Sequence, residues 1–235
     1  MSIQENIAGI REKMRSAAIA AGRNPNEILL CAATKMNDAD AVREAIACGV
    51  DCCGENRVQE LTAKLAEDAY RGVPVHFIGH LQTNKVKQVV GKVDLIQSID
   101  SVHLLEAVQK EAARQGIHQA ILLEVNIGNE ESKSGFTPEE TRKMAAQMQD
   151  FPNVLVKGLM AIPPICTNPG DNDKFFQEMY NLSVDITAKT SDNVCMDILS
   201  MGMSDDYVSA IQWGSTMIRV GTAIFGARNY TKPHQ

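Results

Sequence analysis

The sequence predicts an α/β protein: a (β/α)8 TIM barrel preceded by an N-terminal helix. Eight short apolar runs alternate with segments in which apolar residues recur every three or four positions. Such alternation is typical of a parallel sheet, and eight repeats within 235 residues fit one closed barrel. No composition break or long linker interrupts the pattern, so we expect one domain over residues 1–235. An open doubly wound sheet is the alternative, but no G-x-G-x-x-G motif follows a predicted strand, which disfavours its dinucleotide-binding version.

The first element is expected to be an amphipathic helix. Ile3, Ile7, Ile10 and Met14 recur at helical spacing, and a glycine-proline segment over residues 22–25 ends the pattern. Charged residues are interspersed along this segment, so it does not have the character of a signal peptide.

The eight apolar runs are the expected strands. In order they are residues 28–35, 50–53, 75–80, 95–99, 120–127, 154–162, 198–201 and 216–220. Most of the intervening helical segments end at a glycine, and Thr137, Pro138 and Glu140 predict a capping box at the start of one of them. Residues 166–173 form the longest predicted loop, and residues 204–206 are expected to cap the helix after the seventh strand.

The end of the first strand carries the most informative residue, Lys35. Its apolar run is continuous, which indicates a strand buried on both faces, and Asn37-Asp38 then predicts a helix start. An ammonium group at such a position must be paired, neutralised or consumed in a covalent bond, because burying it alone is costly. A desolvated lysine with a lowered pKa is what imine formation with an aldehyde requires. The alternative is a lysine that extends from the strand end into solvent.

The composition narrows the possible functions. The net charge is -6 and aromatic residues make up 5% of the chain, which argues against a nucleic-acid surface. No apolar run is long enough to cross a bilayer, so we expect no membrane association. The six cysteines form no C-x-x-C motif, and most stand in apolar runs. They are therefore expected to be small buried hydrophobes of a cytoplasmic protein rather than metal ligands.

The carboxyl ends of the strands form the working face of such barrels, and phosphate is often held after strands seven and eight. The strand-end residues of interest are Lys35, Asn56, His80, Asn126, Met160, Ser200 and Arg219. Ser200 offers a hydroxyl group, Ser204 opens a predicted helix, and Gly221-Thr222 offers adjacent N–H groups and another hydroxyl. A lysine facing a phosphate pocket could form an imine with a sugar phosphate or with pyridoxal 5′-phosphate, or could neutralise a substrate's charge. Residue types alone leave these three chemistries open.

Longer motifs resemble the pyridoxal phosphate homeostasis protein family. They are ATK at residues 33–35, GENRVQE at 54–60, HFIGHLQTNK at 76–85, VNI at 125–127, SKSG at 132–135, KGLMAI at 157–162 and the run 199–226. The resemblance covers nearly the whole chain and implies a barrel similar to the N-terminal domain of alanine racemase. It implies pyridoxal phosphate bound as an imine on Lys35, with the phosphate held by Ser200, Gly221 and Thr222. It also places Arg219 at the pyridine nitrogen and Asn56 beside the ring.

The resemblance implies a protein that binds the cofactor, hands it on to apoenzymes and maintains intracellular vitamin B6 homeostasis. An arginine only donates hydrogen bonds, so Arg219 cannot leave a proton on the ring nitrogen and the electron sink is weak. We also expect the second domain and tyrosine base of alanine racemase to be absent, with His80 and Tyr207 as the remaining candidate bases. The expectation is therefore a carrier without established turnover. An amino-acid racemase or related enzyme with Lys35 as base is the alternative, and an imine-forming aldolase is a third hypothesis.

Overall fold

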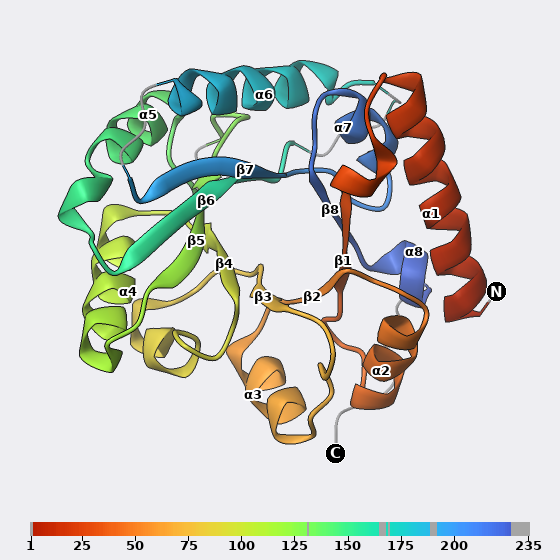
Figure 1. Ribbon diagram of the computed structural model, residues 1–235, viewed down its shortest axis with the longest axis horizontal. Coiled ribbons are helices and arrows are strands. Elements are labelled where there is room, and N and C mark those ends of the chain that lie inside the picture. Colours follow the sequence, from red (N-terminus) through yellow and green to blue (C-terminus); the bar gives the residue numbers. More distant parts are fainter. Residues whose placement is uncertain (1, 131, 165–167, 169, 189–191, 227–235) are drawn as a thin grey trace.

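Eight parallel strands form a closed barrel in sequential order, as predicted (Figure 1). This computed structural model describes residues 2–130, 132–164, 168, 170–188 and 192–226. The strands are β1 Leu29–Ala33, β2 Cys52–Glu55, β3 Val75–Phe77, β4 Leu95–Ile99, β5 Gln119–Val125, β6 Val154–Ala161, β7 Val194–Ser200 and β8 Met217–Val220. Parallel pairing of β1 with β8 closes the barrel. All carboxyl ends therefore meet at one face.

Helices surround the barrel (Figure 1). The α-helices are α1 Ile3–Ala20, α2 Ala39–Ala47, α3 Val58–Ala66, α4 Val102–Gln115, α5 Pro138–Ala146, α6 Asp173–Thr187, α7 Tyr207–Gln212 and α8 Thr222–Phe225. Short 3-10 helices are η1 Pro25–Glu27, η2 Thr83–Gln88 and η3 Met148–Asp150. The N-terminal helix α1 lies beside α7 and α8 and buries Ile7, Ile10 and Met14, which confirms its predicted amphipathic face. None of the helices in the described ranges is both long enough and apolar enough to cross a membrane.

Several predicted boundaries were wrong. β3 ends at Phe77 rather than residue 80, because the chain turns at Gly79, which packs directly against the backbone of Asn56. The helical segment predicted after it is present as the 3-10 helix η2. Residues 204–206 do not cap α7 through Ser204: the helix begins at Tyr207, and Asp206 turns its carboxylate back to the Met203 N–H, 2.7 Å away. Part of the predicted loop over residues 166–173 lies outside the described residues.

The barrel interior is unusually polar and sulfur-rich for this fold, in which branched aliphatic residues normally fill the centre. A buried chain of hydrogen bonds crosses it from His76 on β3 to Arg219 on β8. Nε2 of Gln97 lies 2.9 Å from Nδ1 of His76, and Ser200 donates to Oε1 of Gln97 at 2.7 Å. Arg219 in turn donates from Nη1 to the Ser200 hydroxyl oxygen at 2.6 Å. Each of these buried polar groups thus has a partner, as burial requires.

Candidate functional site

A pocket of about 1370 Å³ opens beyond the carboxyl ends of β1, β2 and β8. Four of the predicted site residues line it: Lys35, Asn56, Gly221 and Thr222. His80 and Lys85 from the segment after β3 also line it. The strand ends therefore bring together the amine, the amide and the glycine-threonine pair that the sequence predicted there.

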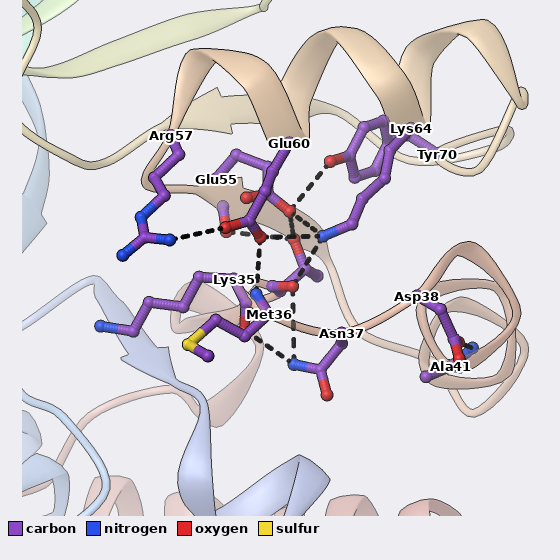
Figure 2. A network of polar contacts seen from close by, with 12 residues as sticks. Lys35, Met36, Asn37, Asp38, Ala41, Glu55, Arg57, Glu60, Lys64 and Tyr70 are labelled. Carbon is purple, nitrogen blue, oxygen red and sulfur yellow. Dashed lines mark hydrogen bonds and ion pairs between the residues drawn. The ribbon is translucent and has the colours of Figure 1, made fainter. Parts of the chain in front are cut away.

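Lys35 lies in a tight turn between β1 and α2, and its side chain is half-buried. The next residue, Met36, has a φ of 63°. A residue other than glycine adopts this left-handed backbone conformation only where its surroundings impose it. The Met36 N–H donates to Oε2 of Glu60 at 2.6 Å, and Asn37 donates to the Lys35 carbonyl oxygen at 3.1 Å (Figure 2). Contacts on both sides of Lys35 thus fix the backbone that carries the amine.

A buried ion pair lies next to this turn (Figure 2). Nζ of Lys64 on α3 lies 2.5 Å from Oε1 of Glu55 at the end of β2, and both side chains are buried. The same ammonium donates to the Thr34 carbonyl oxygen at 2.8 Å. The Thr34 and Tyr70 hydroxyls also donate to Oε1 of Glu55. Burial raises the pKa of the Tyr70 phenol, and the neighbouring carboxylate raises it further, so this phenol stays a donor.

Asn56 presents an unfilled acceptor. Its Oδ1 atom is buried and accepts no hydrogen bond from the described residues. A buried polar atom without a partner costs free energy, so this carbonyl is suited to a donor group of a bound molecule. Gly79 allows the segment after β3 to lie against Asn56, because a Cβ atom at residue 79 would lie 2.1 Å from the Asn56 carbonyl oxygen.

Gly221 and Thr222 lie at the rim where β8 turns into α8. A Cβ atom on Gly221 would lie 3.2 Å from the Ala33 carbonyl oxygen, so a side chain here would crowd the end of β1. Ser204 joins them, because its hydroxyl accepts from the Ala223 N–H at 3.3 Å. The predicted convergence of residue 204 with residues 221–222 is therefore present, although Ser204 does not cap α7.

Ser200 and Arg219 lie deeper than the other candidates and do not line the pocket. Ser200 is fully buried, and its hydroxyl both donates to Gln97 and accepts from Arg219. The second terminal nitrogen of Arg219 donates to the Ala161 carbonyl oxygen at 2.9 Å. Burial lowers the pKa of Arg219 from its ordinary value. The six sequence candidates therefore divide into a rim group of four and an interior pair.

The two candidate bases differ in exposure. His80 is exposed, and its Nδ1 atom lies 2.9 Å from Oδ2 of the buried Asp100 carboxylate. Tyr207 is buried in the apolar core, and this burial raises the pKa of its phenol. Tyr207 is thus packed in the core, whereas His80 is held by a hydrogen bond at the edge of the pocket.

Sequence reasoning missed Glu124, which points into the barrel from β5. Burial raises the pKa of this carboxyl from 4.5 to about 7; the nearby Asp100 raises it as well, while Arg219 and His80 oppose the shift. A single carboxyl in an otherwise apolar strand run was the only available signal.

We expect Glu124→Gln to make the protein more stable above neutral pH. The folded state holds a proton on Glu124 that the unfolded chain releases above pH 4.5, so stability falls as pH rises from 4.5 through about 7. The neutral amide removes this loss, which amounts to at most about 3 kcal/mol for a shift of this size. Urea denaturation at pH 5 and pH 8 measures it, with exposed Glu139→Gln as control. Identical pH dependence in Glu124→Gln and wild type would contradict the assignment.

Comparison with known proteins adds the family. Residues 2–229 match the alanine racemase N-terminal domain family. A pyridoxal phosphate homeostasis protein from Aquifex aeolicus is 40% identical over 230 residues, covering 98% of this chain and 100% of that protein. The crystal structure of an unknown protein from Bifidobacterium adolescentis has a TM-score of 0.88 and 36% identity, over 95% of this chain and 94% of that one. PipY from Synechococcus elongatus, solved with pyridoxal phosphate bound, has a TM-score of 0.82 and 31% identity, over 96% of this chain and 100% of that one. The motifs, the closed barrel and these full-length matches together show that this chain belongs to the pyridoxal phosphate homeostasis proteins, within the alanine racemase N-terminal domain family.

Proposed function

We propose that this protein binds pyridoxal 5′-phosphate covalently through Lys35 and serves vitamin B6 homeostasis by holding the cofactor reversibly. The observation that carries the proposal is the placement of Lys35, in a fixed turn, in the same pocket as Asn56, Gly221 and Thr222. Pyridoxal phosphate supplies an aldehyde that condenses reversibly with an amine. The bound cofactor in PipY and the names of the relatives support this assignment.

The residues present fit the cofactor's functional groups. The N–H groups of Gly221 and Thr222 and the Thr222 hydroxyl would hold the phosphate, because N–H groups at a turn suit an anion. The unpaired Oδ1 of Asn56 accepts from a polar group near the ring. In this proposal Arg219, held by its hydrogen bond to Ser200, would donate to the pyridine nitrogen from the barrel interior, and Ser200 would support the phosphate side of the site.

A carrier role without turnover is part of the proposal. Arg219 is held by Ser200 and the Ala161 carbonyl, and a guanidinium can donate a proton in a hydrogen bond but does not give it up. Of the two candidate bases, Tyr207 is buried in the core and His80 contacts Asp100. We propose that the protein acts in the cytoplasm and delivers the cofactor to apoenzymes.

Borohydride reduction of the protein loaded with pyridoxal phosphate tests the proposal. We expect a pyridoxyl mass on the peptide that contains Lys35, and loss of visible absorption on reduction. Lys64 and Lys85 also line the pocket and serve as internal controls. An adduct found only on these lysines would refute the assignment to Lys35.

The racemase alternative is tested by exchange of the Cα hydrogen of alanine and serine in deuterated water, with near-stoichiometric loaded protein. We expect exchange no faster than free pyridoxal phosphate produces. Exchange or racemisation at about one turnover per second, within the ordinary range for enzymes, that depends on Lys35 would establish catalysis instead.

The phosphate contacts predict different outcomes for the two hydroxyl residues. Thr222→Val removes a hydroxyl that lines the pocket, and we expect about tenfold to hundredfold weaker binding of pyridoxal phosphate, with little change for pyridoxal. Ser200→Ala removes a hydroxyl already engaged by Gln97 and Arg219, so binding of both ligands should weaken through displacement of Arg219. Titration of each variant with both ligands measures this. Equal loss of the two ligands in Thr222→Val would show that the phosphate binds elsewhere.

A further inference from the structure

Three soft donor side chains converge inside the barrel, away from the pocket. Cys31 on β1, Cys52 on β2 and His76 on β3 place one ligand atom each within 4.8 Å of one another, and all three residues are buried. Cys31 and Cys52 are direct partners in the β1–β2 register. They pack together with Met217, the first residue of β8. Cys31 and His76 are the middle residues of their strands, and none of the three residues lines the pocket at the carboxyl ends.

The alternation of a strand explains why only some cysteines take part. Cys52 and Cys53 are neighbours on β2, so their side chains point to opposite faces of the sheet. Cys53 joins the apolar layer between barrel and helices, whereas Cys52 faces inward. The three donors are residues 31, 52 and 76, which are too far apart in the sequence to form a short metal-binding motif. Only the closure of the barrel brings them together.

His76 has the second contact that metal-binding histidines commonly have. Its Nδ1 atom lies 2.9 Å from Nε2 of Gln97, which leaves the ring's Nε2 atom available to a ligand. Ser200 fixes Gln97 from the other side. Metal on Nε2 requires a proton on Nδ1, so Zn²⁺ binding requires the Gln97 amide to reverse. Its oxygen then accepts from Nδ1, and its NH₂ group donates to the Ser200 hydroxyl oxygen in place of the bond that Ser200 now donates.

We propose that Cys31, Cys52 and His76 form a binding site for Zn²⁺. Two thiolates neutralise the charge of the dication, and sulfur and imidazole nitrogen are the donors that this ion prefers. Binding then releases the thiol protons of Cys31 and Cys52. Three protein ligands leave the fourth tetrahedral position to water or another small ligand.

Titration of the reduced, chelator-treated full-length protein with Zn²⁺ against a chromophoric zinc indicator tests the site. We expect one ion per chain with a dissociation constant below about 1 µM, and at least tenfold weaker binding in Cys31→Ala, Cys52→Ala and His76→Gln. Cys53→Ala is the matched control, because Cys53 is equally buried on the same strand but faces away from the cluster. The Zn²⁺ affinity of this variant should be unchanged.

Co²⁺ reports the ligands in the wild-type chain and does not depend on whether a variant folds. We expect a tetrahedral cobalt spectrum with sulfur-to-metal charge-transfer absorption, displaced by Zn²⁺. A Cys31–Cys52 disulfide in freshly purified protein, no charge-transfer band, or an unchanged cobalt spectrum in a folded Cys31→Ala variant would each overturn the proposal.

Discussion

Glu55→Gln is expected to destabilise the protein by about 3–5 kcal/mol, because it removes the nearer counter-charge of the buried Lys64 ammonium and leaves only the partly exposed Glu60 carboxylate, 3.7 Å away. Lys64→Met removes the other partner and should cost a similar amount, since the Glu55 carboxylate is fully buried. The double variant Glu55→Gln/Lys64→Met should recover a substantial part of either loss, because no unpaired charge remains. Urea denaturation of the four proteins completes the double-mutant cycle.

Lys143→Met provides a matched control for Lys64→Met. Lys143 also belongs to an ion pair on a helix, with Glu139 at 2.7 Å, but both side chains are mostly exposed. Its removal should change the stability only slightly, because solvent screens an exposed ion pair. If Lys64→Met were as mild as Lys143→Met, the Glu55–Lys64 pair would not be isolated from water. Loss of Lys64 also removes the donor to the Thr34 carbonyl, so pyridoxal phosphate should attach to Lys35 more slowly in this variant.

The sequence was sufficient for the barrel and for the rim of the pocket. In a parallel barrel every carboxyl end faces the same way, so a residue placed at a strand end is automatically placed at the site. Lys35, Asn56 and Gly221-Thr222 line the same pocket for this reason, and errors of two or three residues in strand boundaries did not change that.

Contacts that depend on the approach of three separate segments could not be predicted from the sequence. The spacing of Glu60 and Lys64 predicts that they share one face of a helix. It does not predict that this face packs against Glu55 and the Thr34 carbonyl. Likewise, the position of Ser200 at a strand end suggested direct contact with phosphate. In the structure its hydroxyl is hydrogen-bonded to Gln97 and Arg219, and Ser200 does not line the pocket.

Lys35→Ala is expected to abolish covalent attachment while leaving a weaker, reversible complex with pyridoxal phosphate. The amine is the nucleophile for the aldehyde, whereas the phosphate and ring contacts come from other strand ends. The variant should show no visible absorption from a lysine linkage and no pyridoxyl mass after borohydride. Lys85→Ala, which removes another lysine from the same pocket, should behave as wild type.

Added methylamine separates the loss of the nucleophile from a loss of the pocket. If the pocket of Lys35→Ala is intact, methylamine should restore the visible absorption of pyridoxal phosphate bound to the variant, and borohydride should then yield a product that is not attached to the chain. Pyridoxal, which lacks the phosphate, should show much weaker rescue, because Gly221 and Thr222 no longer have an anion to hold. A covalent adduct that persists in Lys35→Ala would move the attachment to another lysine. If methylamine failed to restore the absorption in a folded variant that still binds the cofactor, loss of the amine alone would not explain the defect, and the turn over residues 34–37 would also shape the pocket.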